Sequence, residues 1–422
     1  MGTRAAEVMS VVFVNRFCHP DHSATSQILS DLAGGLSSQG MAVAMVASRQ
    51  RYDDPSAQLQ AREFWRGVHI HRVWTSRFGR TRLVGRAIDY LTFYFSLPWV
   101  LWRLLRRGDV VVAKTDPPLV SLVVALVAKL RGAVLVNWLQ DVFPEIAVSL
   151  RQPPLPRPLV WLLKKLRNRS LRAAAMNVTI GERMAEYFVS QGVAATRIQV
   201  IPNWAHEDAI EPRPSENCLL RRKLGLQDQF VVGYSGNLGR AHDWTTIFDA
   251  AQGLRDNAGI AFVIVGGGHG YDCLRARAAE AGLANVYFQP YQPLDLLSDS
   301  MAAANLHLVS LRPELEGQIV PSKFYGIAAA ERAVGFIGDP DGELARLVAN
   351  ADCGFSVPQG RGDLLAEAIL RSAADLAECQ SQGRRARKLL DQRFSRGAAH
   401  QQWHDLLLAL ASAAQPSSNH LN

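Results

Sequence analysis

Residues 316–331 read EGQIVPSKFYGIAAAE, and they join an apolar strand to a helix rich in small residues. The strand is expected at Leu306–Leu311, and the polar loop after it ends at Pro321-Ser322-Lys323. Pro suits the first turn of a helix, where the Ser322 hydroxyl can bind free backbone N–H groups. The positive end of a helix beside a lysine favours an anion site. The alternative is an ordinary strand–loop–helix unit whose lysine lies in solvent.

The same alternation of short apolar strands and helices runs through both halves of the chain. Continuous Val-rich strands separated by helices argue for parallel sheets that are covered on both faces. Two such α/β series predict two Rossmann-like domains that face each other across a ligand-binding cleft. We expect domains at 1–202 and 203–394, a final helix at 395–414 and a frayed tail at 415–422.

The expected strands are apolar runs that follow polar turns. They are Val11–Asn15, Ala42–Ser48, Val68–Val73, Asp109–Lys114, Ala133–Trp138 and Met176–Ile180 in the first half, then Phe230–Ser235, Ala261–Val265, Val286–Gln289, Asn305–Leu311, Val334–Ile337 and Gly354–Val357 in the second.

Composition limits the classes of function. The 422 residues are 48% hydrophobic and 20% charged, which is enough for two sizeable cores. The five cysteines are scattered and form no CxxC motif, so neither a disulfide framework nor a zinc site is expected. A net charge of +8 favours an anionic partner, and without a nucleic-acid motif we expect phosphates and a membrane surface instead. No signal peptide is recognised, so a cytoplasmic location is predicted.

Two glycine-rich turns follow strands of the second half. Ser235–Arg240 reads SGNLGR and Val265–Gly270 reads VGGGHG. Glycine permits a tight turn and a close approach of the backbone to a ligand, and Arg240 can bind phosphate through its guanidinium fork. Each turn alone is also compatible with an ordinary flexible loop, and that reading is slightly favoured for His269.

Polar residues also follow strands of the first half. The loop 15–27 reads NRFCHPDHSATSQ and contains His19 and His22, although a loop histidine is more often simply solvated. The segment 138–145 reads WLQDVFPE, and Asp141 lies just past an apolar strand. A charged residue at that place caps a helix or serves a site, and we favour a site.

These motifs resemble those of the retaining glycosyltransferases of family 4, which have the GT-B fold. The branch used in bacterial surface-polysaccharide assembly has a similar Pro-Ser-Lys-aromatic-Tyr segment, a Gly-x-x-Gly-Arg donor loop and a Gln-Asp pair followed by an aromatic residue and Pro. The wider family carries two Glu residues at the positions of Gln318 and Gly326, and a common Gly at the position of Glu331. The usual Lys downstream of Arg240 is also missing, and His242 and Asp243 stand nearby.

The resemblance implies a hexosyl- or N-acetylhexosaminyl-type transferase that moves a sugar from a nucleoside diphosphate, with a UDP-sugar favoured, to a polyprenyl-diphosphate-linked glycan. The product would be a lipopolysaccharide or exopolysaccharide. It implies a final helix that crosses back to the first domain, and neither a metal nor another cofactor. Catalytic roles are implied for Asp141, His22 and Lys323. Donor binding is implied for Gly236, Asn237, Arg240, Gly267, Tyr291, Gln318, Ser322, Lys323 and Tyr325.

Two segments of the first half bear on a membrane. Residues 91–102 read LTFYFSLPWVLW, and this uncharged run is too short to span a bilayer, which needs about 20 residues. Flanking arginines and aromatic residues suit a membrane interface. Residues 159–171 read LVWLLKKLRNRSL and have the same character. Together they predict peripheral attachment to the inner face of the plasma membrane, while either segment alone could be a buried helix with basic ends.

Two other functions stay open. The same two-domain architecture occurs in nucleotide-sugar epimerases, which would turn over free nucleotide sugar without an acceptor. The loss of both family Glu residues also allows a catalytically inactive protein that binds nucleotide sugar or acts as a scaffold.

Overall fold

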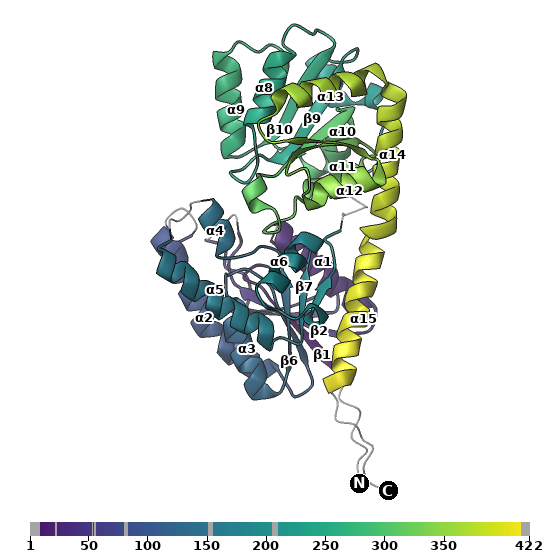
Figure 1. Ribbon diagram of the computed structural model, residues 1–422. Coiled ribbons are helices and arrows are strands. Elements are labelled where there is room, and N and C mark those ends of the chain that lie inside the picture. Colours follow the sequence, from purple (N-terminus) through teal and green to yellow (C-terminus); the bar gives the residue numbers. More distant parts are fainter. Residues whose placement is uncertain are drawn as a thin grey trace, which may run out of the picture. The chain divides into compact units, whose positions relative to one another are not determined.

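The computed structural model describes residues 9–21, 23–52, 54, 56–79, 83–150, 155–204 and 210–414 (Figure 1). Internal contacts divide the chain into two compact units, Met1–Pro202 with Ala399–Asn422, and Asn203–Ala398. Each unit has its own largely parallel sheet with helices packed on it. The predicted α/β fold with two Rossmann-like domains is confirmed.

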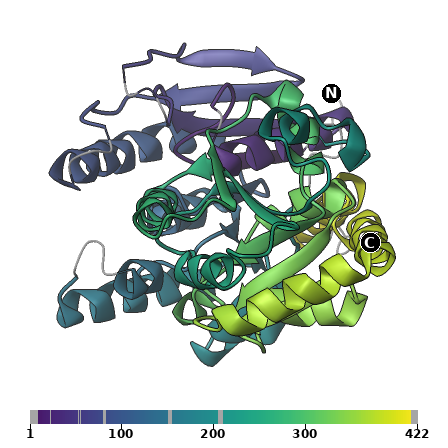
Figure 2. The same cartoon turned by 90° about the horizontal axis from the view of Figure 1, so that it is seen from above.

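The sheet of the first unit has the strand order β3-β4-β2-β1-β5-β6-β7-β8. Its strands are β1 (Ser10–Val14), β2 (Ala42–Ser48), β3 (Arg62–Trp65), β4 (Val68–Val73), β5 (Val110–Ala113), β6 (Val134–Leu139), β7 (Met176–Thr179) and β8 (Ile198–Val200). Only the β3–β4 pairing is antiparallel in the described part of this sheet, and Figure 2 shows that hairpin at its edge. Strands β1 and β5 are neighbours, so the chain reverses its direction of travel across the sheet between them.

Helices cover both faces of this sheet. They are α1 (Ala24–Ser38), α2 (Leu83–Leu104), α3 (Val120–Arg131), α4 (Glu145–Ser149), α5 (Arg157–Ala173) and α6 (Glu182–Ser190). Helices α2, α3 and α5 lie side by side (Figure 1). Phe93, Leu97 and Leu101 of α2 are fully buried against the β-strands, with Val124 of α3 in the same core.

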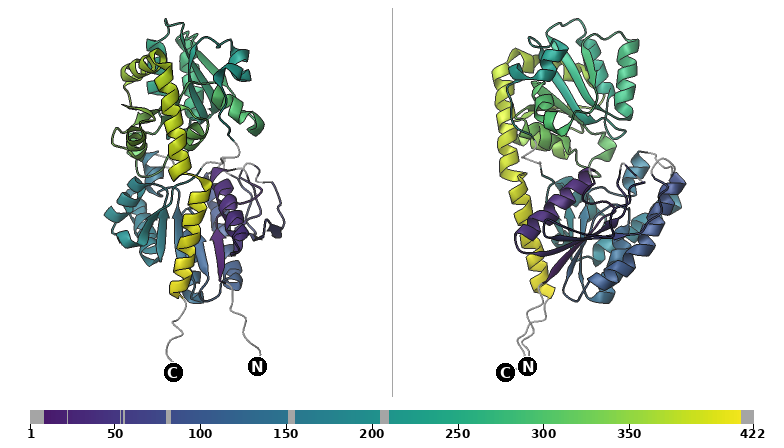
Figure 3. Two further views of the ribbon diagram at one scale, coloured as in Figure 1. Left: turned by 90° about the vertical axis from the view of Figure 1, so that its right-hand side faces the viewer. Right: turned by 180° about the vertical axis from the view of Figure 1, so that it is seen from behind.

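The last helix, α15 (Arg396–Ala414), belongs to the first unit from Ala399 onward. Trp403 is fully buried, and its ring lies 4.8 Å from that of Trp138 on β6. Nε2 of His400 lies 3.2 Å from Oδ2 of Asp31 on α1, beside which α15 runs in Figure 3. The predicted return of the final helix to the N-terminal domain is therefore confirmed.

The sheet of the second unit has the order β11-β10-β9-β12-β13-β14, and all its pairings are parallel. Its strands are β9 (Phe230–Asn237), β10 (Ile260–Gly267), β11 (Val286–Gln289), β12 (Leu306–Ser310), β13 (Ala333–Gly338) and β14 (Gly354–Pro358). The helices are α7 (Leu219–Leu224), α8 (Thr245–Gly253), α9 (His269–Glu280), α10 (Leu297–Ala302), α11 (Lys323–Ala329), α12 (Glu343–Ala351), α13 (Gly362–Ala374) and α14 (Leu376–Arg393). The direction of travel reverses between β9 and β12, and ligands of such sheets bind where this happens, at the carboxyl ends of the strands.

Candidate active site

Lys323 lies where the loops after β9 and β12 meet. It is the first residue of α11, and its Nζ is 2.9 Å from Nε2 of His242. Its side chain passes so close to Gly236 that a Cβ there would lie 3.3 Å from Cε of Lys323. Nζ also lies 5.4 Å from the centre of the Tyr234 ring. The structure thus brings two of the predicted donor-site residues, Gly236 and Lys323, into contact.

His242 fixes the direction of one hydrogen bond of Lys323. Its Nδ1 lies 2.5 Å from the carbonyl oxygen of Ser310, which can only accept, so the ring proton resides on Nδ1. Nε2 is then free to accept from the ammonium group of Lys323. Burial, and then the charge of Lys323, lower the pKa of His242 to about 3, so the ring stays neutral near pH 7.

The side chain of Lys323 changes its charge near neutral pH. Part of the side chain remains open to solvent, but the protein packed around it removes much of its hydration. This burial lowers the pKa of Lys323 to about 7. A negatively charged ligand would favour the protonated form. The site is therefore able to take up a proton together with an anion.

The glycines of the second turn are required by its geometry. Gly268 has φ of +108°, and a Cβ there would lie 2.2 Å from Oδ1 of Asn237. Gly266 has φ of +139°, and a Cβ there would lie 2.1 Å from the carbonyl oxygen of Gly236. At Gly267 a Cβ would approach the ring of Tyr291 to 3.1 Å. The predicted residues Gly236, Asn237, Gly267 and Tyr291 therefore form one continuous surface.

The other predicted donor residues do not join this cluster by described contacts. Arg240 is exposed in the loop after β9, and its side chain forms no hydrogen bond, ion pair or ring contact within the described ranges. Gln318 donates from Nε2 to the carbonyl oxygen of Glu314 at 2.6 Å. Tyr325 is buried, with its ring 5.5 Å from that of Phe394. The predicted capping bond of Ser322 is wrong, because its side chain is exposed and accepts no bond from α11.

The first unit has a second charged group at the reversal point of its own sheet. Lys114 follows β5, is 2% exposed, and donates from Nζ to the carbonyl oxygen of Thr25 at 2.6 Å. Nζ lies 4.0 Å from the centre of the Trp138 ring. Burial lowers the pKa of Lys114 to about 7, and the nearby carboxylates of Asp141 and Asp116 act in the opposite direction.

Asp141 follows β6 on the same edge of the sheet. Together with Lys114 it lines a small cavity of about 30 Å³. The residue retains exposed surface, yet burial of its carboxyl and the negative charge of Asp116 raise its pKa to about 6, while Lys114 acts to lower it. A carboxylate that gains its charge near neutral pH suits general acid–base or orienting roles.

The structure describes only one of the two histidines in the loop 15–27. His22 lies outside the described residues, so its predicted catalytic role stays a prediction. His19 stacks on Trp65 with ring centres 4.3 Å apart, and its Nε2 lies 3.9 Å from Oε1 of Glu63. Among the described residues no group of three or more His, Cys, Asp or Glu side chains could hold a metal ion.

Comparison with known proteins matches each unit to a glycosyltransferase family model. Residues 24–204 match the family model described as Glycosyl transferase 4-like domain, and residues 219–389 match Glycosyl transferases group 1. WbjE of Pseudomonas aeruginosa, a probable glycosyltransferase, is 28% identical over 76% of this chain and 79% of its own. WcaI of Escherichia coli (strain K12) is 30% identical over 48% of this chain and 51% of its own.

Solved structures agree on the fold. Sucrose-phosphate synthase from Thermosynechococcus elongatus has a TM-score of 0.73 at 16% identity, over 96% of this chain and all of its own. HepE from Anabaena, in complex with UDP-glucose, has a TM-score of 0.68 at 17% identity, over 95% of this chain and all of its own. The two family matches and the likeness to WbjE support a glycosyltransferase, and the solved structures show that its fold is GT-B.

Proposed function

We propose that this glycosyltransferase retains the anomeric configuration of its donor and works in the synthesis of a cell-surface polysaccharide. It would transfer a hexosyl or N-acetylhexosaminyl group from a UDP-sugar to a glycan carried on a lipid diphosphate. The observation that carries the proposal is the contact of Lys323 with His242 and Gly236, at the reversal point of the second sheet. Support for the pathway comes from WcaI, whose name assigns it to colanic acid biosynthesis.

The donor would bind at the carboxyl ends of β9, β10 and β12. HepE, which has the same fold, was solved with UDP-glucose bound, and this supports a uridine nucleotide. The turn at Gly266–Gly268 offers backbone without side chains, against which a nucleotide can lie closely. Lys323 would place its positive charge on the diphosphate, and Arg240 is a second cation from the loop after β9.

The bond to the anomeric carbon breaks as negative charge builds on the leaving diphosphate. Lys323 would stabilise this charge more strongly than it stabilises the intact donor, which lowers the barrier. We propose that the reaction uses no cofactor besides the nucleotide-sugar donor. In the retaining family that the sequence resembles, the leaving phosphate takes the proton of the acceptor hydroxyl, which attacks on the same face.

The acceptor would be oriented by the first unit. Asp141, in its ionised form, can accept a hydrogen bond from the attacking hydroxyl. Lys114 lies beside it and, through its bond to the carbonyl oxygen of Thr25, holds a fixed position next to the same small cavity. His22 is retained as a candidate for the same side of the reaction.

Attachment to the inner membrane surface would bring the enzyme to its acceptor. Large apolar side chains of α2, α3 and α5 are exposed, among them Phe95, Trp99, Leu130 and Trp161. Cations lie over three of the tryptophan rings, with Arg103 at 4.4 Å from Trp99, Arg131 at 5.1 Å from Trp102 and Lys165 at 4.9 Å from Trp161. Exposed tryptophan next to Arg or Lys suits the headgroup region of a bilayer. None of the described helices is long and apolar enough to cross a membrane.

The decisive experiment is product analysis. The protein is incubated with a panel of nucleotide sugars and a polyprenyl-diphosphate glycan, and the new linkage is assigned by NMR. We expect transfer to the lipid-linked glycan with the anomeric configuration of the donor preserved. Turnover of free nucleotide sugar without an acceptor would instead indicate an epimerase, and nucleotide binding without any transfer would indicate an inactive binding protein.

A further inference from the structure

A cavity of about 240 Å³ lies in the first unit between the loops that follow β2 and β4. We name it the β2–β4 cavity. The residues that give it its chemical character are Arg49, Gln58, Gln60, Trp74, Thr75 and Arg77. Nothing in the proposed transfer reaction uses these residues.

The lining is suited to a sugar that carries a negative charge. Arg49 and Arg77 are exposed, no residue of the described lining is acidic, and within the described ranges neither arginine forms an ion pair. With its amide oriented to satisfy both groups, Gln58 accepts a 2.7 Å hydrogen bond from NH1 of Arg77. Trp74 is 58% exposed and offers an apolar surface beside these polar groups. Arginine binds carboxylates through paired hydrogen bonds, while amides and an aromatic surface suit hydroxyls and C–H groups.

Thr75 provides an independent sign of a ligand. It is 3% exposed, and its hydroxyl is buried without a hydrogen-bond partner in the described part of the chain. A buried polar group without a partner destabilises the folded protein, so a ligand that pairs with it gains binding energy. Thr75 lines the cavity, and rotation about its χ1 would turn this hydroxyl toward a sugar hydroxyl bound there.

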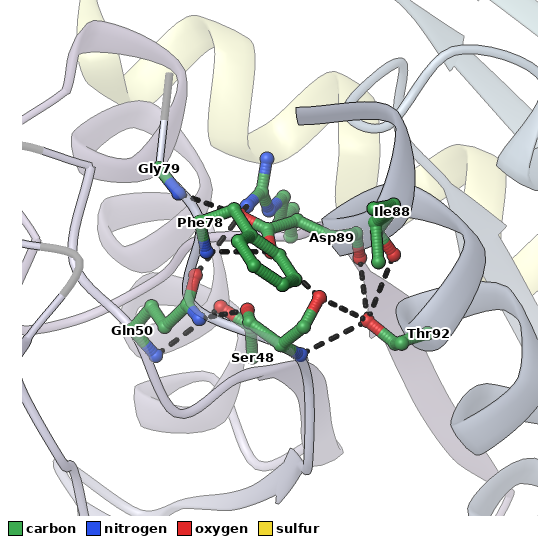
Figure 4. Close-up of polar contacts among 9 residues, drawn as sticks. Ser48, Gln50, Phe78, Gly79, Ile88, Asp89 and Thr92 are labelled. Atoms are coloured by element: carbon green, nitrogen blue, oxygen red, sulfur yellow. Dashed lines mark hydrogen bonds and ion pairs between the residues drawn. The ribbon is translucent and has the colours of Figure 1, made fainter. Parts of the chain in front are cut away.

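Hydrogen bonds to Asp89, which Figure 4 shows, hold the loop that follows β4 and lines the cavity. The carboxylate of Asp89 accepts hydrogen bonds from the backbone N of Phe78 and of Gly79, each at 3.0 Å, and from the Ser76 hydroxyl at 2.7 Å. The buried guanidinium of Arg16 is paired with the same carboxylate at 3.3 Å.

Gln50, which also lines the cavity, joins the two loops. Its Nε2 donates to the carbonyl oxygen of Ser76, and its Oε1 lies 3.4 Å from NH2 of Arg16. Because these bonds hold the loop after β4 before a ligand arrives, less conformational entropy would be lost on binding.

The position of the cavity fits an extended acceptor. Strands β2, β4 and β6 are parallel members of one sheet, so the β2–β4 cavity and Asp141 lie at the same edge. Three strand spacings separate β2 from β6, which is about 14 Å at the usual distance between strands. A sugar in the cavity would therefore be a more distant unit of the acceptor and not the one that receives the new residue.

We propose that the β2–β4 cavity binds a carboxylate-bearing sugar, a uronic acid, in the acceptor glycan. Arg49 and Arg77 bind the carboxylate, Trp74 and the glutamine amides contact the sugar ring, and the Thr75 hydroxyl pairs with a sugar hydroxyl. This inference rests on the proposed transfer to a glycan, which it extends by naming the acidic character of that glycan.

Direct binding tests the site without requiring catalysis. Saturation-transfer NMR on the full chain is performed with the methyl glycosides of glucuronate and galacturonate, with methyl glucoside as the neutral probe, and with inorganic phosphate as a competitor. We expect at least one uronide to bind, the glucoside to bind much more weakly, and phosphate to displace the uronide poorly. Absence of binding by both uronides overturns the inference, as does equal binding of phosphate, which would indicate an unspecific anion site.

Variants assign the binding to this cavity. Arg49→Gln with Arg77→Gln should weaken uronide binding by about tenfold or more, since hydrogen bonds to charged groups are strong. The matched control, Arg371→Gln, removes an exposed charge of the second unit and should have no effect. Thr75→Val should weaken binding while leaving the melting temperature unchanged or higher, because it removes an unpartnered polar atom. Full affinity in the double Arg variant or in Thr75→Val would contradict the assignment.

Failure of this inference is distinguishable from failure of the proposed function. Glycosyl transfer with no uronide binding would retain the function and discard the acidic acceptor. Uronide binding that depends on Arg49 and Arg77, without any transfer, would retain the site and discard the function.

Discussion

At the scale of single residues, the proposed role of Lys323 makes donor binding depend on pH. The pKa of Lys323 is about 7 in the free protein, so its charge is present below pH 7 and is lost as the pH rises through that value. His242 stays neutral throughout this range. We predict that UDP binds more tightly at pH 6 than at pH 8, and that isothermal titration in buffers of different ionisation enthalpy detects proton uptake.

Lys323→Met should remove both effects. The thioether keeps the length of the side chain without the charge, so UDP affinity should fall about ten- to a hundredfold, the loss of a hydrogen bond between charged groups. Binding of uridine, which has no phosphate, should change little. Equal losses for UDP and uridine would show that Lys323 does not contact phosphate.

His242→Gln tests the support behind Lys323. The Gln carbonyl can still accept from the lysine, whereas His242→Phe leaves the ammonium group without that acceptor. We therefore expect the His242→Gln variant to keep most of the UDP affinity and the His242→Phe variant to bind UDP much more weakly. If both variants bind UDP like the wild-type protein, His242 does not position Lys323.

Asp141 should control turnover and not donor binding. Its pKa is raised to about 6, so the carboxylate that is proposed to orient the acceptor is formed above pH 6 and is protonated below it. We predict that kcat falls as the pH drops below about 6. Asp141→Asn should lower kcat by 10²-fold or more, on the order of a general-base contribution, and leave the Kd for UDP nearly unchanged. A parallel loss of UDP affinity would place Asp141 in the nucleotide site.

Some of these site residues could be predicted from the sequence and others could not. Asp141 stands just past an apolar strand, and Lys323 ends the polar loop that follows another strand, so their place at the sheet edge could be predicted. Lys114 also ends an apolar strand, but its role depends on the carbonyl oxygen of Thr25 and on the Trp138 ring, which are distant in sequence. The loss of the Ser322 cap could not be foreseen, because Ser322 itself adopts helical torsion angles and its side chain does not reach back to α11.

At the scale of elements, the exposed face of α2, α3 and α5 predicts salt-sensitive membrane attachment. Each basic residue near an anionic leaflet contributes about 1 kcal/mol, and salt screens this attraction. High salt or carbonate should therefore release most of the protein from membranes. Extraction by detergent alone would contradict peripheral attachment.

Two variants separate charge from apolar contact. Changing Arg103, Arg106 and Arg107 together to Gln should weaken binding to anionic vesicles and leave the small affinity for neutral vesicles unchanged. Trp99→Ser, at a residue that is 64% exposed, should weaken both while leaving the fold intact. If neither variant changes vesicle binding in a flotation assay, this face does not contact the membrane.

Elements with long apolar or periodic sequences were predicted nearly to their ends. Strands β2, β4 and β11 begin and end at the predicted residues. Strand β3 was missed because its four residues, REFW, lie at an exposed sheet edge and lack an apolar run. Helix α8 begins at Thr245, and the Asp243 carboxylate just before it accepts from the backbone N of Thr245 and of Thr246.

At the scale of the whole molecule, one helix far along the chain completes the core of the first unit. Trp403 is fully buried and contacts Trp138, whose strand leads to Asp141. We predict that Trp403→Ala destabilises the first unit by about 3–5 kcal/mol, the usual loss for a large buried side chain. Calorimetry should show a lower melting transition for that unit and an unchanged one for the second.

Trp161→Ala is the matched control, because this tryptophan is 63% exposed in the same unit. It should leave both transitions in place. A shift of the second unit's transition in Trp403→Ala would mean that the two units unfold together.

The architecture could be read from sequence because the two strand–helix series are regular, and the confirmed fold follows from them. The return of α15 to the first unit was expected only from the resemblance to GT-B enzymes, since nothing in the sequence of that helix indicates which unit it packs against. The contact of Trp403 with Trp138 joins positions that no local pattern relates. How the two domains face each other stays a prediction.

The place of α15 in the chain has a consequence for biosynthesis. Domains generally begin to fold while the ribosome is still translating, starting from the N-terminus. Here the N-terminal core lacks Trp403 until the second unit has been made and α15 has left the ribosome tunnel. The nascent first unit must therefore wait, with the apolar surface around Trp138 uncovered, while nearly 200 further residues are added. A messenger cut short in the second half of the gene would leave that surface open for good, and chaperones and proteases recognise such surfaces.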